Sequence, residues 1–326
     1  MTQHKAKFTS YLYILLLFNI FCNGDANSRV DFDISMGRAT EYYDKFYKAC
    51  LASLNYYKLC TDGRPAVDLL NFLRNLYNKN FATDAETRIR VPEIIHMVWL
   101  GKELPEKFHS FRNSWIDHHP SWTHILWVDN PKNYKFGELI QDITDLENKL
   151  ISGQFAGKKI VIDVKHIKLF NQKYYDKAVN FGEKSDLFRY EMLYKFGGLY
   201  VDVDFECLKP FTKLNRQYDF YCGIQPLDVN ALALNIALMG TIAGHPILKD
   251  CIETIRNDMH LSEVFIRTGP VHFTKSFWRT ALDKRLKNIA FPATYFYPLG
   301  MCQPRNKKNI IQKESYAIHW WAGSWT

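Results

Sequence analysis

Residues 195–211, KFGGLYVDVDFECLKPF, constrain the fold more than any other stretch of the sequence. Two glycines are followed there by three acidic residues, Asp202, Asp204 and Glu206, which alternate with apolar residues. Alternate residues of a β-strand share one face, so a strand over this stretch would carry all three acids, and Tyr200, on a single side. The other side is apolar enough to hold the strand in a sheet. The acidic side therefore calls for a chemical explanation.

Two carboxylates one strand repeat apart, ~6.5–7 Å, repel each other unless they are exposed to water, protonated or bridged by a cation. Hard oxygen ligands of this kind favour Mg²⁺ or Mn²⁺. A polar strand face in solvent is the structural alternative. Since the flanking residues look buried, the pattern favours a metal site at Asp202 and Asp204.

The residues before the glycine pair predict a helix over 185–196, which ends at Gly197 and Gly198. Ser185 is a suitable N-cap. Asp186 and Arg189 are three residues apart and would lie on one helical face. Because this helix leads directly into the acidic stretch, the two side chains could line the same cleft. A simple ion pair within the helix is the alternative.

The segment after residue 90 predicts an α/β fold. Apolar segments at 91–101 and 121–130 read as strands, and the residues between them, 102–120, read as a helix. A strand, a helix and a second strand form a βαβ unit, which implies a parallel sheet. A further helix is expected over 133–150. Ligand sites of such sheets open at the carboxyl ends of the strands, where the acids would lie.

The first 88 residues differ from the rest. A basic start, an apolar run and small residues up to 26 are typical of a signal peptide or a short signal anchor. Residues 27–88 predict a helical region, with helices over 39–60 and 65–80 that form a hairpin. Beyond the leader six cysteines remain, an even number that permits disulfides in an exported chain.

The composition sets limits on function. Hydrophobic residues make up 47% of the 326, which suits a globular protein with a substantial core. The net charge is +8, but the basic residues are scattered, so no nucleic-acid partner is expected. A mildly basic surface also suits an anionic nucleotide or a membrane face.

The aromatic C-terminal segment, with His319, Ser324 and Trp325, could fold over a site as a lid and supply a ligand.

Five segments in a fixed order resemble the DXD-containing sugar transferases of glycosyltransferase family 32, which includes Golgi α-mannosyltransferases and inositol-phosphoceramide mannosyltransferases; the large glucosylating toxins are distant relatives. The segments are VPEIIHMVW at 91–99, the stretch 185–211, ALNIALMGTIAGHPIL at 233–248, RTGPVHF at 267–273 and AIHWWAGSW at 317–325. The resemblance implies a fold of the GT-A type over 89–326, with a mixed, mainly parallel sheet. It also implies retaining transfer of a hexose from a nucleotide sugar with Mn²⁺ as cofactor and Mg²⁺ as the alternative.

The resemblance assigns roles to particular residues. Trp99 would stack on the base, and Asn235 would contact the sugar. Asp186 and Arg189 would hold hydroxyls of the donor. The metal ligands would be Asp202, Asp204 and His319, and Ser324 and Trp325 would touch the diphosphate.

The resemblance also implies the substrates and the compartment. The donor would be a GDP- or UDP-hexose and the acceptor a glycan, glycolipid or protein. A eukaryotic protein would work in the Golgi or ER lumen or membrane, and a bacterial one would be exported or bound to the envelope.

Three other functions fit parts of the pattern. A sugar- or metal-binding module related to the transferases would share the site without turnover. A phosphohydrolase of the haloacid-dehalogenase type also has a D-x-D after an apolar strand, but its motif stands early in the domain and continues with Thr or Gly-Thr. A glycosidase usually takes its two carboxyl groups from separate elements. The residues favour the transferase over all three.

Overall fold

The computed structural model describes residues 29–38, 41, 44–45, 66–83, 86–131, 136–229, 232–305 and 310–323. The leader, all of the first helix of the expected hairpin except residues 41 and 44–45, and the residues Ser324 and Trp325 lie outside the described residues. No helix in these ranges is long and apolar enough to cross a membrane. The four cysteines within them, Cys207, Cys222, Cys251 and Cys302, are free thiols.

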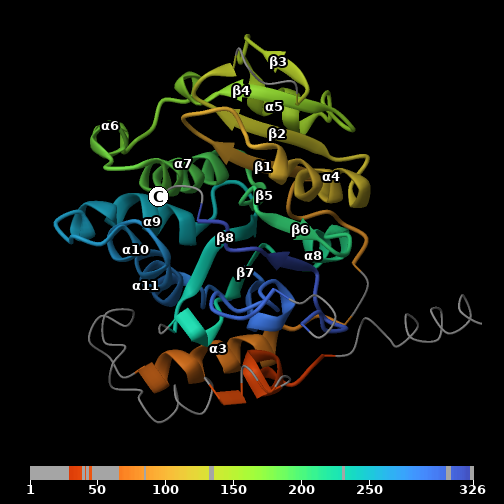
Figure 1. The fold of residues 1–326 in the computed structure, drawn as a ribbon, viewed down its shortest axis with the longest axis vertical. Helices are drawn as coiled ribbons and strands as arrows, with labels where there is room; N and C mark the ends of the chain where they lie inside the picture. Colours follow the sequence, from red (N-terminus) through yellow and green to blue (C-terminus); the bar gives the residue numbers. More distant parts are fainter. Residues whose placement is uncertain are drawn as a thin grey trace, which may run out of the picture.

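A single eight-stranded sheet forms the centre of the molecule (Figure 1). Its strands lie in the order β3-β4-β2-β1-β5-β8-β7-β9. In that order they span Glu138–Ile140, Lys159–Asp163, Thr123–Val128, Ile94–Trp99, Gly198–Val201, Leu234–Thr241, Phe220–Ile224 and Asn288–Phe291. Only β8 runs antiparallel to its neighbours in this sheet. The expected α/β fold with a mixed, mainly parallel sheet is confirmed, and its form is that expected for the GT-A type.

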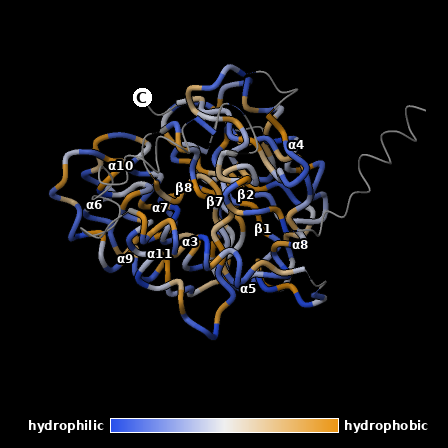
Figure 2. Tube along the Cα trace, turned by 90° about the horizontal axis from the view of Figure 1, so that it is seen from below, coloured by the Kyte–Doolittle hydropathy of each residue, from blue (hydrophilic) through white to orange (hydrophobic). Residues whose placement is uncertain are grey.

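Helices cover both faces of the sheet (Figure 1). On one side lie α7 (Phe181–Phe196), α9 (Pro246–Asp258), α10 (Val264–Arg267) and α11 (Pro270–Thr280), and on the other lie α4 (His109–His118) and α8 (Thr212–Gln217). Further helices whose bounds lie in the described ranges are η1 (Ile34–Arg38), α3 (Ala66–Asn80), η3 (Glu106–Phe108), α5 (Leu146–Ile151), η5 (Val164–His166), α6 (Gln172–Lys177), η6 (Leu227–Val229) and η7 (Ala293–Tyr295). The strands between the layers are mostly hydrophobic, with hydrophilic segments around them (Figure 2).

The βαβ unit after residue 90 is confirmed. β1 and β2 pair in parallel, and α4 connects them. All residues of β2 are buried, as expected for a strand covered on both faces. The second helix of the predicted hairpin is also confirmed as α3, in which the Tyr77 hydroxyl bonds the Tyr295 hydroxyl at 2.8 Å.

The single helix expected over 133–150 is wrong. Residues 138–140 instead form β3, which pairs in parallel with β4 at the edge of the sheet, and the helix α5 begins only at Leu146. Pairing with a neighbouring strand outweighs the local helical preference of these few residues.

The helix before the glycine pair begins earlier than expected. It is α7 and starts at Phe181, with Asn180 rather than Ser185 as its N-cap. The Asn180 side chain accepts a hydrogen bond from the backbone N–H of Glu183 at 2.8 Å, and Glu183 in return accepts one from the N–H of Val179 at 2.7 Å. The first bond satisfies a free donor of the first turn, and the second ties the residue before the N-cap to the helix. The predicted end at Gly197 is confirmed, with φ of 65° there.

The acidic residues do not continue a strand, which corrects the expected single face. β5 ends at Val201, residues 202–204 turn away, and the Phe205 N–H donates to the Asp202 carbonyl at 3.1 Å. The chain then enters β6 (Phe205–Cys207), which pairs with β10 (Ala317–His319) in a separate two-stranded sheet. Glu206 accepts a hydrogen bond from the Trp320 indole at 3.1 Å, apart from the other acids.

A buried ion pair fastens α10 to the first turn of α7. Arg267 donates to both carboxylate oxygens of Glu183, at 2.6 and 2.9 Å, and both side chains are less than a tenth exposed. Burial acts to raise the pKa of Glu183, but the hydrogen bonds from Arg267 and the Val179 N–H outweigh it and hold this pKa below its usual value. The ion pair thus fixes the position of α10 over the carboxyl end of the sheet.

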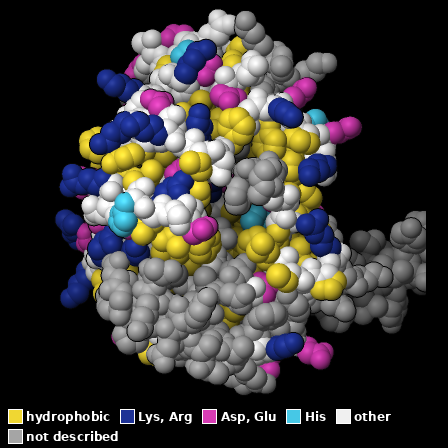
Figure 3. Space-filling view, turned by 60° about the vertical axis from the view of Figure 1, so that its left-hand side comes forward, with side chains coloured by type: hydrophobic (Ala, Val, Ile, Leu, Met, Phe, Trp, Pro, Cys, Tyr) yellow, Lys and Arg dark blue, Asp and Glu magenta, His cyan; other side chains and the backbone are white. Residues whose placement is uncertain are grey.

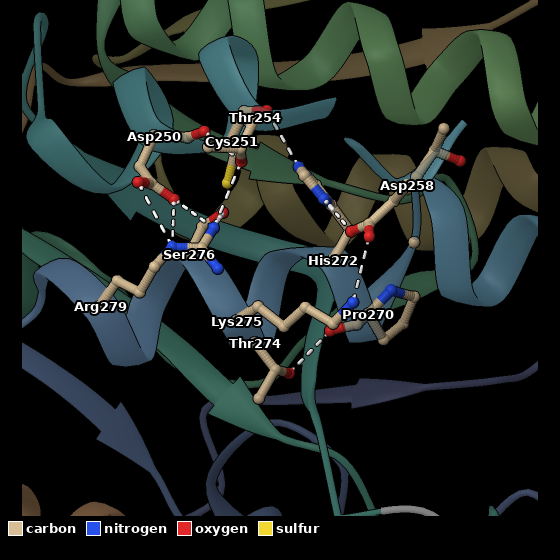
Figure 4. A network of polar contacts seen from close by, with 12 residues as sticks. Asp250, Cys251, Thr254, Asp258, Pro270, His272, Thr274, Lys275, Ser276 and Arg279 are labelled. Carbon is tan, nitrogen blue, oxygen red and sulfur yellow. Dashed lines mark hydrogen bonds and ion pairs between the residues drawn. The ribbon is translucent and has the colours of Figure 1, made fainter. Parts of the chain in front are cut away.

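A second polar network holds α11 against α9 (Figure 4). His272 bonds Asp258 at 2.8 Å and the Cys251 carbonyl at 2.9 Å, and Lys275 bonds the same aspartate at 3.1 Å. Because α10 lies between α9 and α11 in the chain, this network restrains both of its ends, in addition to the ion pair at Arg267.

Gly198→Ala should destabilise the fold by about 3 kcal/mol, because it adds both backbone strain and crowding. Gly198 has φ of 101°, and a Cβ there would lie 2.8 Å from the Ile94 carbonyl oxygen and 2.9 Å from His96 Nε2. Gly153 is the matched control: its φ is 74°, but nothing lies within 4 Å of an added Cβ. Gly153→Ala should cost only about 1 kcal/mol. Urea denaturation of both variants measures the difference, and equal losses would contradict the crowding at Gly198.

Arg267→Met should lower the free energy of unfolding by about 3–5 kcal/mol at neutral pH, because it leaves the Glu183 carboxylate buried and unpaired. The Glu183 pKa is lowered in the folded state, so the stability that the pair contributes is lost as pH falls through the ordinary carboxyl range. The deficit of the variant should therefore shrink in acid.

The double variant Glu183→Gln/Arg267→Met is the control, and it should recover part of the stability because no unpaired charge is left. Denaturation at neutral and at acid pH checks both points. A deficit that is unchanged in acid and in the double variant would mean that the ion pair is not its cause.

Candidate active site

A cavity of about 470 Å³ opens at the carboxyl ends of β1 and β5. Its walls come from segments far apart in the sequence: the end of β1, the first half of α7, the turn at 202–204, the start of β8, the α10–α11 junction and the C-terminal segment. Figure 3 shows this face of the molecule hollowed between hydrophobic side chains. The size suits a small organic ligand.

The cavity contains seven of the residues expected from the sequence: Trp99, Asp186, Arg189, Asp202, Asp204, Asn235 and His319. Their backbone positions are set by β1, α7, the turn after β5, β8 and β10. Positions 99 and 319 are 220 residues apart in the chain, yet they line one cavity. The structure thus brings together every described residue of the predicted site.

Asp202, Asp204 and His319 form the one group of metal-ligand type found among the described residues. Each offers one ligand atom, and these atoms all lie within 4.8 Å of one another. His319 Nε2 lies 3.1 Å from Asp204 Oδ1, and the other carboxylate oxygen of Asp204 accepts the N–H of Ala322 at 2.7 Å. The tail of the chain is therefore hydrogen-bonded to the acidic turn.

The two aspartates of the turn differ electrostatically. Burial raises the pKa of Asp202, with a further contribution from Asp204, although Arg189 opposes it. Burial also acts to raise the pKa of Asp204, but His319 and the N–H of Ala322 outweigh it, so this pKa is lowered. A positive charge between the two carboxylates would relieve their repulsion.

The surroundings of His319 fit a divalent cation. Its ring stacks on Phe205, with ring centroids 4.5 Å apart and an angle of 6° between the planes, which fixes its orientation. The buried Nδ1 atom has no hydrogen-bond partner in the structure. Two carboxylates and an imidazole are a donor set that suits Mn²⁺. The residues present therefore fit the cation that the family resemblance implies.

Arg189 is held in place beside the metal-ligand group. Its guanidinium donates to the Ile236 carbonyl at 3.0 Å and to the Ser185 hydroxyl at 3.1 Å. It also lies 3.2 Å from Asp186 and 3.4 Å from Asp202. Burial acts to lower the pKa of Arg189, but its contacts, chiefly Tyr200 and the two aspartates, outweigh it and raise this pKa. The side chain remains positively charged.

Asp186 is buried between Arg189 and α10. The Thr268 hydroxyl donates to its second carboxylate oxygen at 3.1 Å. Burial raises the pKa of Asp186 to about 7, although Arg189 and Thr268 act in the opposite direction. The carboxyl group can therefore accept or donate a hydrogen bond near neutral pH.

Trp99 and Asn235 lie at two other parts of the wall. The Trp99 indole N–H donates to the Lys102 carbonyl at 2.7 Å, which fixes the ring at the end of β1. The side-chain oxygen of Asn235 accepts the N–H of Ala237 at 2.9 Å.

Several residues of the site were not expected to take part. Tyr200 donates to Asp202 at 2.6 Å and lies under the Arg189 guanidinium, which is 4.5 Å from the ring centroid. Thr268 bonds Asp186. Gln225 and Phe265 line the cavity. Thr268 belongs to the quoted RTGPVHF segment, and Tyr200 belongs to 185–211 and alternates with the acids, so the sequence could have pointed to both; no sequence signal marks Gln225 or Phe265.

The comparisons with known proteins agree with this geometry. Residues 105–221 match the family described as a glycosyltransferase sugar-binding region containing a DXD motif. Within those residues the sequence Asp-x-Asp occurs once, at 202–204.

Two curated relatives illustrate the range of the similarity. The inositol phosphoceramide mannosyltransferase 3 of Schizosaccharomyces pombe is 26% identical over 226 residues, which cover 66% of this chain and 52% of that protein. The subversion of eukaryotic traffic protein A of Legionella pneumophila is 24% identical over 234 residues, which cover 71% and 34%. This chain spans between 52% and 58% of the length of three mannosyltransferases of S. pombe.

Among solved structures, the PaToxG glycosyltransferase is 17% identical, with a TM-score of 0.46 over 67% of this chain and 80% of that one. The family match covers the acidic turn and the helix before it, which form one of the five segments on which the resemblance to sugar transferases is based. Residues 105–221 are therefore similar to the DXD-containing sugar-binding region of glycosyltransferases.

Proposed function

We propose that the protein is a metal-dependent, retaining glycosyltransferase that moves a hexose from a nucleotide sugar to an acceptor. The observation that carries this proposal is the convergence of Asp202, Asp204 and His319 on one point in the cavity, next to the fixed guanidinium of Arg189. The family match supports the reaction class. Because three related proteins are named mannosyltransferases, GDP-mannose is the first donor to test, and UDP-hexoses come next.

Asp202, Asp204 and His319 would hold the divalent cation, with Mn²⁺ favoured over Mg²⁺ because one ligand is an imidazole. The bound cation would neutralise the charge that builds on the diphosphate as the sugar leaves. His319 is suited to this role because its ring is fixed by Phe205 and its backbone by β10. Such preorganisation gives a charged site its catalytic value.

Arg189 and Asp186 would bind the donor. A guanidinium donates hydrogen bonds and a carboxyl group accepts them, so the pair can hold neighbouring hydroxyls of a ribose or hexose. The Trp99 ring lies at the end of β1, where it can stack on the base. Asn235 would face the sugar. Ser324 and Trp325 are proposed to contact the diphosphate from the end of the tail.

The carboxyl groups among the described residues that line the cavity belong to Asp186, Asp202 and Asp204. Each is already bonded to Arg189, Tyr200, Thr268, His319 or the tail backbone. A covalent intermediate needs a free carboxylate close to the anomeric carbon. We therefore propose attack on the front face of the sugar in one step, without a covalent enzyme intermediate.

The acceptor would be a glycan, a glycolipid or a protein of the secretory pathway or the cell envelope. A signal peptide or signal anchor at the start of the sequence would bring the enzyme to that compartment. A membrane-associated state, peripheral or anchored, is part of this proposal. The rest of the cavity wall, where Val264, Phe265, Pro270 and Met301 lie, is mostly apolar and leaves room for an acceptor beside the donor.

Asp204→Asn should lower kcat by about 10²–10³ or more, because it removes the charge that holds the cation while it preserves the shape of the side chain. The assay is nucleotide release from GDP-mannose and UDP-hexoses with Mn²⁺, together with calorimetric titration of the metal. Glu206→Gln is the matched control, since Glu206 faces the Trp320 indole. Near-normal turnover and metal affinity in Asp204→Asn would refute the metal site.

Removal of divalent metal with EDTA should abolish nucleotide release, and added Mn²⁺ should restore it. The reason is that a bound cation relieves the repulsion between the two carboxylates and the diphosphate. The thermal unfolding midpoint of the metal-free protein shows whether the fold survives the treatment. Full activity in EDTA would contradict metal dependence. Tight binding of donor and metal with no release or transfer for any donor would instead favour a non-catalytic binding module.

A further inference from the structure

We propose that residues 165–184, together with Phe265 and Met301, form a surface that docks on an anionic lipid bilayer and places the cavity mouth at the membrane. We call residues 165–184 the docking segment. The segment includes η5, α6 and the start of α7. The inference deepens the proposed function, on which it rests for the identity of the cavity, by naming the surface from which the enzyme works.

The docking segment is strongly basic. It contains five lysines, namely Lys165, Lys168, Lys173, Lys177 and Lys184. Its acidic residues are two, Asp176 and Glu183, and Glu183 is buried and paired with Arg267 outside the segment. Lys165 pairs with the buried Asp163 at 2.6 Å, just outside the segment, so four lysines stand against one exposed acid. Each lysine near an anionic bilayer contributes about 1 kcal/mol to binding.

The docking segment also exposes large apolar side chains. Phe170 is 78% exposed, Val179 71% and Phe181 46%. The backbone under two of them is fixed: the N–H of Phe170 donates to Glu191, and that of Val179 donates to Glu183. Apolar side chains held outward on a fixed backbone gain free energy when they enter the interface of a bilayer.

The apolar side chains continue around the cavity mouth. Phe181 lines the cavity, as do Phe265 and Met301, which are 41% and 59% exposed. The Arg267–Glu183 pair holds α10, and with it Phe265, beside the first turn of α7. Figure 3 shows hydrophobic side chains around the hollow, with Lys or Arg side chains on both sides of it. Because Phe181 belongs to the docking segment and also lines the cavity, the docking segment reaches the cavity rim.

The residue types favour a lipid surface over a protein partner. Protein interfaces are depleted in lysine at their centres and enriched in arginine. The docking segment has five lysines and no arginine. Lysines next to exposed aromatic and aliphatic residues are instead the pattern of segments that lie in the interface of an anionic membrane. A cavity whose mouth faces the bilayer would take its acceptor from the membrane plane.

The test is amide hydrogen exchange of the full chain, measured by mass spectrometry with vesicles of phosphatidylcholine alone and with vesicles that also contain phosphatidylserine. This local readout separates the docking segment from any binding by the N-terminal leader. Exchange in 165–184 should slow several-fold on the anionic vesicles alone, and high salt should reverse the effect. Exchange in 146–157, around α5, should not change.

Lys168→Gln/Lys177→Gln should weaken docking about 30-fold, because two charges of about 1 kcal/mol each are removed, and should abolish the protection. Phe170→Ser/Val179→Ser should have a similar effect without a change in charge. The matched controls are Lys149→Gln/Lys158→Gln and Ile151→Ser/Leu282→Ser, which change exposed or half-buried residues outside the docking segment. These controls should keep the protection.

Nucleotide release in solution should be unchanged in all four variants, since none of these residues lines the cavity. If residues 165–184 are protected from exchange but no donor releases nucleotide, the docking surface is supported and the proposed reaction is refuted. The docking proposal is overturned by release without protection, by equal protection on neutral vesicles, or by protection that survives both variants of the docking segment.

Discussion

The buried positive charge of Arg189 is the interaction on which the rest of the site depends. A guanidinium only 5% exposed must be compensated, and here it is compensated by Asp186, Asp202, the Ser185 hydroxyl and the Ile236 carbonyl. These partners come from α7, the turn after β5 and β8. One side chain thus fixes the relative positions of the elements that carry the proposed donor and metal ligands. Arginine suits this role because its planar fork makes several fixed hydrogen bonds at once.

The tail depends on the same turn from the other side. β10 pairs with β6, Ala317 and Ile318 are fully buried, and the Trp320 N–H donates to the Asp204 carbonyl at 3.0 Å. Removal of the chain from residue 317 onward would therefore expose core and break a sheet, which confounds any loss of activity with a loss of structure. Point substitutions at His319 separate the two, since the strand would remain paired.

The sequence predicted the parts of the fold that depend on local pattern. The strands on either side of α4, the end of α7 at Gly197 and the helix α3 all follow from periodicity and glycine placement. It missed β3, because three residues at a sheet edge owe their conformation to the pairing with β4 rather than to their own preference. It also misplaced the N-cap of α7, because Ser185 and Asn180 are both good caps and only the bond to Glu183 decides between them.

The candidate site was predicted more completely than the helices and strands that carry it. The resemblance identified its residues from sequence motifs, which does not require knowledge of their contacts in space. Thr268 and Tyr200 were missed because each acts through another side chain, Asp186 or Asp202. A pattern of two residues on one helix or strand can be read from spacing. A contact between α7 and a threonine 82 residues later depends on the packing of α9, α10 and α11, which no local pattern encodes.

The turn at 202–204 explains how the two aspartates can share a site. On a continuous strand their carboxylates would stand ~6.5–7 Å apart and point in the same direction, at the limit of what one cation can bridge. The chain instead leaves the sheet after Val201, so the two side chains converge, and His319 enters from β10 to within 4.8 Å of both. The change of sheet also separates Glu206, which bonds Trp320 instead. A strand end, a turn and a partner strand from the C-terminal segment are therefore all needed to make a D-x-D sequence into a metal site.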